Sequence, residues 1–210
     1  MDLHDHGIAM VYDRLMRRSE RSGLGAKRRE LLADLHGHVV EIGAGTGANL
    51  PHVPASVHRL TLLEPSPPMA ERLRARAGEG AVASPTVDIE VGRAPAEALP
   101  LADASADAVV STLVLCSVDD LDRSLAELRR VLRPGGRLVL IEHVAAHGSV
   151  GLVQRLLAPM WRIVAGGCQL RRDTRAAVAN AGFDVTDVHP WRLPGGGPAA
   201  PAIAGIASRR

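Results

Sequence analysis

Apolar residues recur at helical spacing near the start of the chain. The spacing holds at Ile8, Val11, Tyr12, Leu15 and Met16. A Gly/Ser break at residues 22–25 separates this segment from a second helical pattern, Ala26–Leu35. The pattern therefore predicts two leading helices, which together form an N-terminal helical cap over residues 1–35.

From residue 36 onward, short apolar runs alternate with helical patterns. The runs predicted as strands are His38–Ile42, Arg59–Leu63, Thr86–Val91, Ala108–Leu115 and Arg137–Val144. The helices expected between them are Pro67–Ala77 and Leu121–Leu132. This repeated βαβ order favours a parallel, doubly wound sheet with right-handed crossovers.

The last third of the chain has a different pattern. The stretch Val150–Gly167 predicts an amphipathic helix pair broken at Pro159, and Asp173–Ala181 predicts one more helix. Two strands, Phe183–Leu193 and Ala202–Ser208, flank a Gly/Pro turn and suggest a terminal hairpin. We expect an α/β, Rossmann-like fold of seven strands, mostly parallel with an antiparallel C-terminal strand.

Composition and charge limit the number of domains and the partners. A chain of 210 residues with 46% hydrophobic residues suits one domain over 1–210, with its core in 36–210. The formal net charge is only +2. The basic stretch Arg14–Arg29 lacks interleaved aromatic residues, so we interpret it as a solvated helix and expect no nucleic-acid partner.

Cysteine usage and the apolar runs indicate a cytoplasmic protein. The two cysteines, Cys116 and Cys168, lack CxxC spacing, and the N-terminus lacks the apolar run of a secretory signal. Charged residues and Pro159 interrupt the stretch at 150–167, so we expect no transmembrane segment. Peripheral membrane contact and a lid role both remain open for that stretch, as do a monomer and a homodimer.

A glycine-rich turn, VVEIGAGTG (39–47), follows the first predicted strand. Glycines there let the backbone approach a nucleotide, but Gly43, Gly45 and Ala48 also satisfy the dinucleotide pattern GxGxxG/A. Glu64, at the end of the second strand, would accept hydrogen bonds from the ribose of either cofactor. Glu41 favours the cation S-adenosylmethionine (SAM) over a pyrophosphate, because its carboxylate creates negative potential beside the turn. An NAD(P)-dependent oxidoreductase is the alternative of another class.

Four motifs in order resemble the class I SAM-dependent methyltransferases: EIGAGTG (41–47), LLEPSPPM (62–69), AEALPLADASADAVV (96–110) and VLRPGG (131–136). The resemblance implies SAM as cofactor, with S-adenosylhomocysteine as its product. It implies that Glu41 and the glycine turn hold the methionine end, that Glu64 binds the ribose, and that Pro65 and Met69 border the adenine. The implied cofactor-binding residues are Glu41, Gly43, Ala44, Gly45, Gly47, Asn49, Glu64, Pro65, Met69, Ala96, Glu97, Thr112 and Leu113.

A narrower resemblance covers STLVLCSV (111–118), IEHVA (141–145) and GGCQLRRDT (166–174). These segments are similar to the alkyl thiol methyltransferases of vertebrate membranes and their bacterial relatives, whose membrane-anchoring leader we do not expect here. Phospholipid-amine and quinone-ring or phenol methyltransferases are further away. The resemblance implies a small-molecule acceptor, with a thiol as the first candidate.

Methyl transfer from a sulfonium is an in-line displacement, which requires collinear alignment and exclusion of water, and we expect no metal. Acceptor groups should come from the ends of the fourth and fifth strands, where His143, Glu142 and Cys116 are the catalytic candidates. Two plainer interpretations stay open: Cys116 as a small buried residue and His143 as a residue that orients a loop. The chain has LCSV where amide and exocyclic-amine methyltransferases carry N-P-P-[YFW]. A non-catalytic SAM-binding module is the third alternative.

Overall fold

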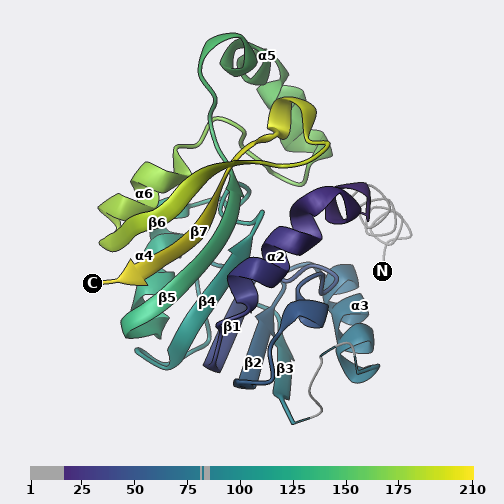
Figure 1. The fold of residues 1–210 in the computed structure, drawn as a ribbon, viewed down its shortest axis with the longest axis vertical. Coiled ribbons are helices and arrows are strands. Elements are labelled where there is room, and N and C mark those ends of the chain that lie inside the picture. The colour runs from purple at the N-terminus through teal and green to yellow at the C-terminus, as the bar shows by residue number, and fades with distance from the viewer. Residues whose placement is uncertain (1–16, 81, 83–85) are drawn as a thin grey trace.

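A seven-stranded sheet forms the centre of the molecule in the computed structural model, which describes residues 17–80, 82 and 86–210 (Figure 1). The spatial order is β3-β2-β1-β4-β5-β7-β6. The strand bounds are β1 Gly37–Ile42, β2 Val57–Leu63, β3 Asp88–Gly92, β4 Ala106–Thr112, β5 Leu132–His143, β6 Phe183–Arg192 and β7 Pro201–Arg209. The first five strands are parallel, and β7 runs antiparallel between β5 and β6. The predicted Rossmann-like fold is confirmed.

Helices cover both faces of the sheet. Their bounds are η1 Glu20–Leu24, α2 Gly25–Leu32, η2 Leu50–His52, α3 Pro67–Gly78, α4 Leu121–Val131, α5 Gly148–Val164, α6 Thr174–Asn180 and η3 Gly197–Ala199. Side chains alternate along a strand, so neighbouring residues of β1 face opposite sides of the sheet. Val40 lies in the core between the sheet and helices α4 and α6, whereas Val39 lies in the core between the sheet and helices α2 and α3. Glu41 shares the face of Val39. The first predicted helix, at residues 8–16, lies outside the described residues.

Strand β4 ends earlier than the sequence pattern predicted. The run Ala108–Leu115 was expected to be extended throughout, but β4 stops at Thr112 and Leu113 adopts a φ of 61°. The Leu113 N–H donates to Ile141 O at 2.7 Å, so the chain leaves the strand while still bonded to β5. Cys116 therefore lies in a turn beyond the sheet, where its backbone contacts differ from those of a strand residue.

The expected helix pair at 150–167 is wrong, because the segment forms the single helix α5 with Pro159 inside it. A proline removes one backbone hydrogen bond but need not end a helix. In Figure 1, α5 projects beyond the end of the sheet. Its buried residue is Gln154, whose side-chain amide bonds Ala146 N, Val144 O and Pro198 O. Large apolar side chains of α5 are exposed, among them Leu156, Ile163 and Val164.

Candidate active site

The glycine turn follows β1 at the carboxyl edge of the sheet. Its glycines adopt positive φ angles, which residues with a side chain disfavour. Gly43, Gly45 and Gly47 have φ values of 52°, 57° and 83°. A Cβ on Gly43 would lie 2.6 Å from Val114, so the turn packs directly against the loop after β4. A Cβ on Gly45 would have no neighbour closer than 4.0 Å. The turn is closed toward the protein at Gly43 and open at Gly45, which leaves room for a ligand.

Glu64 stabilises this turn at the end of β2. One carboxylate oxygen accepts from Gly45 N at 2.8 Å, and the other accepts from Ser66 N at 2.8 Å. Ala44 N donates to Leu63 O at 3.1 Å, which ties the same turn to β2. Each carboxylate oxygen has more than one lone-pair direction, so Glu64 retains capacity to accept from a ribose hydroxyl.

A chain of buried polar contacts surrounds Glu41. Asn49 Nδ2 donates to Glu41 Oε1 at 2.9 Å and lies 3.2 Å from Thr112 Oγ1, while Asn49 Oδ1 accepts from Arg28 at 2.8 Å. Arg28 also pairs with Glu20 at 3.1 Å. The interpretation of the whole basic stretch as solvated is wrong for Arg28, which is 5% exposed. Sequence reasoning missed this residue because the local charge pattern does not show what packs over a helix.

Burial makes the carboxyl group of Glu41 a weaker acid than usual. Removal from water raises the pKa of its carboxyl from 4.5 to about 7, despite the Asn49 hydrogen bond and the positive charge of Arg28, and the charge of Glu64 adds to the rise. A carboxyl group in this state gains from a bound cation. The donors and acceptors present therefore fit SAM, which carries an ammonium, a sulfonium and ribose hydroxyls.

The remaining predicted cofactor residues border the same edge. Ala44 and Ala96 are buried, Thr112 and Met69 are half-buried and Pro65 is exposed. The Glu97 carboxylate accepts from the backbone N–H groups of Asp119 and Asp120, at 3.0 and 3.2 Å. Glu97 thereby links the predicted adenine side to the start of α4.

Glu142, at the end of β5, is fully buried and bonded to the loop after β4. Its Oε1 accepts from Ser111 Oγ at 2.7 Å and from the N–H groups of Val114 and Leu115 at 3.1 and 3.0 Å. Its Oε2 accepts from Cys116 N at 3.1 Å. With four donors on one carboxylate, Glu142 is placed to hold the backbone that carries Cys116.

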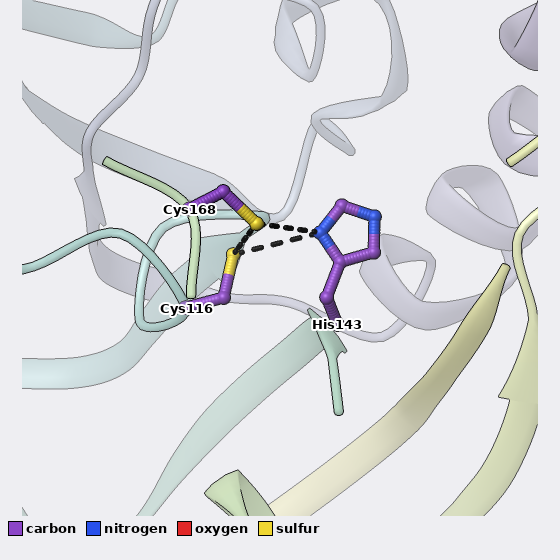
Figure 2. A group of neighbouring side chains, drawn as sticks. All are labelled: Cys116, His143 and Cys168. Atoms are coloured by element: carbon purple, nitrogen blue, oxygen red, sulfur yellow. Dashed lines mark hydrogen bonds between the residues drawn. The ribbon is translucent and has the colours of Figure 1, made fainter. Parts of the chain in front are cut away.

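Two cysteines and a histidine converge beside this loop (Figure 2). His143 Nδ1 lies 3.6 Å from Cys116 Sγ and 3.4 Å from Cys168 Sγ, and the two sulfurs are 3.7 Å apart. All three residues are buried. The structure thus brings together two predicted residues, Cys116 and His143, with Cys168, to which sequence reasoning gave no role. The available signal was the position of Cys168 within GGCQLRRDT.

The two thiols and the imidazole shift one another's pKa values. The contact with Cys168, together with burial and the Glu142 charge, raises the pKa of the Cys116 thiol, and the same contact lowers the pKa of Cys168. Burial by itself would lower the pKa of His143. The hydrogen bond and charge of Cys116, with the charge of Glu142, outweigh burial and raise it. Of the two thiols, Cys168 therefore ionises more readily than Cys116.

The segment after α5 carries Cys168. Several hydrogen bonds to backbone oxygens hold this segment against the loop after β4. Gln169 N donates to Cys116 O at 2.8 Å, and the Arg172 guanidinium donates to Leu115 O and Val118 O at 2.6 Å each. Gly167, with a φ of 91°, would bring a Cβ to 3.1 Å from Ser117 O. The segment therefore lies closely against the loop after β4.

Comparison with known proteins places these features in a family context. The methyltransferase domain family matches residues 40–140. The human thiol S-methyltransferase TMT1B is 38% identical over 175 residues, which cover 75% of this chain and 68% of that protein. Human thiol S-methyltransferase TMT1A is 36% identical over 170 residues, covering 76% and 68%.

Solved structures share the fold at lower identity. The methyltransferase seen in complex with the Haloferax volcanii Trm112 methyltransferase activator superposes with a TM-score of 0.75 at 17% identity, over 99% of this chain and 98% of that one. A SAM-dependent methyltransferase from Thermotoga maritima gives a TM-score of 0.63 at 24% identity, over 96% and 99%. At these identities the likeness shows the architecture alone.

Proposed function

The chain belongs to the class I SAM-dependent methyltransferases, and from that premise we propose that its acceptor is a small-molecule thiol, which it converts to a methyl thioether. The observation that carries the proposal is the buried group of Cys116, His143 and Cys168 at the loop after β4. The relatives named thiol S-methyltransferase support the same acceptor. Membership of this family sets aside the NAD(P)-dependent oxidoreductase that GxGxxA left open.

For the donor half, we propose the binding roles that the family resemblance implies. Glu41, Asn49 and the turn Gly43–Gly47 bind the methionine end, where the buried carboxylate receives the ammonium. Glu64 binds the ribose at the end of β2. The adenine and the rest of the cofactor are bordered by Pro65, Met69, Ala96, Glu97, Thr112 and Leu113.

When bound, SAM supplies an electrophilic methyl group on its sulfonium. The acceptor sulfur forms a bond to the methyl carbon as the sulfonium carbon–sulfur bond breaks, and the thiol proton is lost. The chain must hold the acceptor sulfur in line and keep water away. Cys116 and His143 border the proposed acceptor position, and Glu142 acts as a positioning residue through the loop backbone.

An acceptor screen tests the thiol proposal. Purified protein is incubated with methyl-labelled SAM and, separately, an aliphatic thiol, a phenol, a quinol, an amine and a phospholipid amine. We expect label in the methyl thioether and in no other product. Transfer to the phenol, quinol or amine without transfer to the thiol would refute the proposal. Binding of S-adenosylhomocysteine without any transfer would favour the non-catalytic module.

The location, partners and oligomeric state of the enzyme are proposed as the sequence predicts them. No helix among the described residues has the length and apolar character needed to cross a membrane. We propose a cytoplasmic enzyme that acts on a small molecule and has no nucleic-acid partner, as monomer or homodimer. A lid and a peripheral membrane contact are the two roles left for the exposed apolar side of α5. The donor half of the reaction needs no metal.

A further inference from the structure

We propose that Cys116, His143 and Cys168 bind a zinc ion whose fourth coordination position receives the acceptor thiol. The proposal rests on the proposed thiol acceptor and adds a metal site on the acceptor side. The three ligand atoms are Cys116 Sγ, Cys168 Sγ and His143 Nδ1, and all lie within 4.8 Å of one another. No other such group of three was found in the part of the chain that the structure describes.

The spacing of the three atoms fits tetrahedral zinc. Zinc–sulfur bonds of about 2.3 Å and zinc–nitrogen bonds of about 2.0 Å place two sulfurs about 3.8 Å apart and a sulfur and a nitrogen about 3.5 Å apart. The observed separations are 3.7 Å between the sulfurs and 3.6 and 3.4 Å from the sulfurs to Nδ1. The three separations therefore match those between ligands of one tetrahedral zinc ion.

The chemistry of the ligands and the burial of the site favour the same ion. Thiolate and imidazole ligands in a tetrahedral arrangement are typical of zinc. Two thiolates balance the charge of one Zn²⁺, so zinc bound to its three protein ligands alone forms a neutral group that is compatible with a buried position.

The surrounding contacts hold each ligand from a different part of the chain. Cys116 is held through its N–H by Glu142 and through its C=O by Gln169 N. His143 ends β5, where its backbone pairs with Ala202 of β7; its Nδ1 faces the sulfurs, whereas its Nε2 is buried without a hydrogen-bond partner. Cys168 follows Gly167, which lies against the Cys116 loop. These backbone contacts orient Cys116 and Cys168 before the metal binds, whereas the His143 ring lacks the hydrogen bond from its second nitrogen that metal-binding histidines usually make.

Three protein ligands leave one tetrahedral position open, as in catalytic rather than structural zinc sites. An acceptor R–SH that enters this position loses its proton to solvent, because a coordinating thiol is deprotonated by the metal. The zinc-bound sulfur then forms the S–CH₃ bond, and the electron pair of the broken sulfonium bond stays on S-adenosylhomocysteine. The product is a neutral thioether, a weaker ligand than the thiolate, so it dissociates. The balance is one thiol and one SAM to one thioether, one S-adenosylhomocysteine and one proton.

The metal content of the full chain tests the proposal. The protein is purified without chelator or affinity tag, reduced, equilibrated with zinc, desalted and measured by mass spectrometry. We expect one zinc ion per chain. Replacement by Co²⁺ should give a sulfur-to-cobalt charge-transfer band. Absence of both signals would overturn the site.

Variants locate the ion. Cys116→Ala, Cys168→Ala and His143→Ala should each lose most of the zinc and the cobalt band while still binding S-adenosylhomocysteine, which reports a folded donor site. His189→Ala, an exposed histidine, and the double change His4→Ala with His6→Ala should keep the metal. Zinc retained in a Cys116→Ala, Cys168→Ala double variant would overturn the proposal.

Metal removal separates this inference from the proposed function. Chelation of the wild-type protein should leave S-adenosylhomocysteine binding unchanged, abolish thiol methylation, and allow recovery on zinc addition. Thiol methylation that persists in metal-free protein would overturn the zinc site and leave the thiol acceptor standing. Bound zinc together with transfer only to phenols or amines would refute the thiol acceptor and, with it, the proposed role of the fourth position.

Discussion

We expect the ionisation of Glu41, a proposed cofactor-binding residue, to set the pH dependence of cofactor binding. Its pKa of about 7 means that near neutral pH about half of the ligand-free molecules carry a protonated carboxyl. If the ionised form binds the ligand ammonium, affinity should increase as pH rises through 7. The ionised fraction grows from about a tenth at pH 6 to about nine-tenths at pH 8, so affinity should rise about tenfold, or about 1.4 kcal/mol.

The ligand-free protein should respond in the opposite direction. A carboxyl whose pKa rises from 4.5 on folding contributes stability that is fully present below pH 4.5 and lost as pH rises through about 7. The pKa difference corresponds to about 3 kcal/mol as an order of magnitude. Rising pH therefore weakens the ligand-free fold through Glu41 while it strengthens ligand binding at the same group.

Calorimetric titration with S-adenosylhomocysteine measures this effect. Titrations at pH 6, 7 and 8, each in two buffers of different ionisation enthalpy, give the affinity and the protons released. We expect about half a proton released at pH 7. The matched control is Glu41→Gln, which keeps the shape but cannot ionise and should bind weakly with no pH dependence. An affinity that stays constant from pH 6 to 8 in the wild type, or changes equally in Glu41→Gln, would refute the reasoning.

Three further predictions concern the edge of the sheet. Gly43→Ala, which forces a side chain into a φ of 52° and a 2.6 Å contact, should lower the free energy of unfolding by about 1–3 kcal/mol in denaturant titrations. Gly78→Ala, whose Cβ would meet no neighbour within 4 Å, is the control and should be neutral or stabilising. Glu142→Gln should lose about 1–3 kcal/mol of stability, because an amide nitrogen cannot accept from the Cys116 N–H. Unchanged stability of Glu142→Gln would contradict this assignment. Glu64→Ala removes the acceptor of the Gly45 N–H and should weaken S-adenosylhomocysteine binding about 10-fold or more, measured by calorimetry; unchanged affinity would contradict its assigned role.

Local sequence determined the backbone of the proposed donor site. The apolar run before the glycines becomes β1, and all three glycines of the turn adopt positive φ. Glu64 lies beside the turn because parallel neighbouring strands end at the same edge of the sheet, with Ile42 opposite Leu63. These features follow from strand periodicity and from conformations that glycine tolerates, both of which are encoded within a few residues.

Only the tertiary structure decided which residues form the proposed acceptor site. Cys116 and Cys168 are 52 residues apart, and their contact with His143 depends on how the segment after α5 lies against the loop after β4. Arg28 is buried and bonded to Asn49 and Glu20, contacts that no local charge pattern predicts. Helix α5 continues through Pro159 and exposes its apolar side chains, against the expected helix pair. Spacing along the chain predicts backbone conformation, whereas long-range contacts between loops are settled only when the whole chain packs.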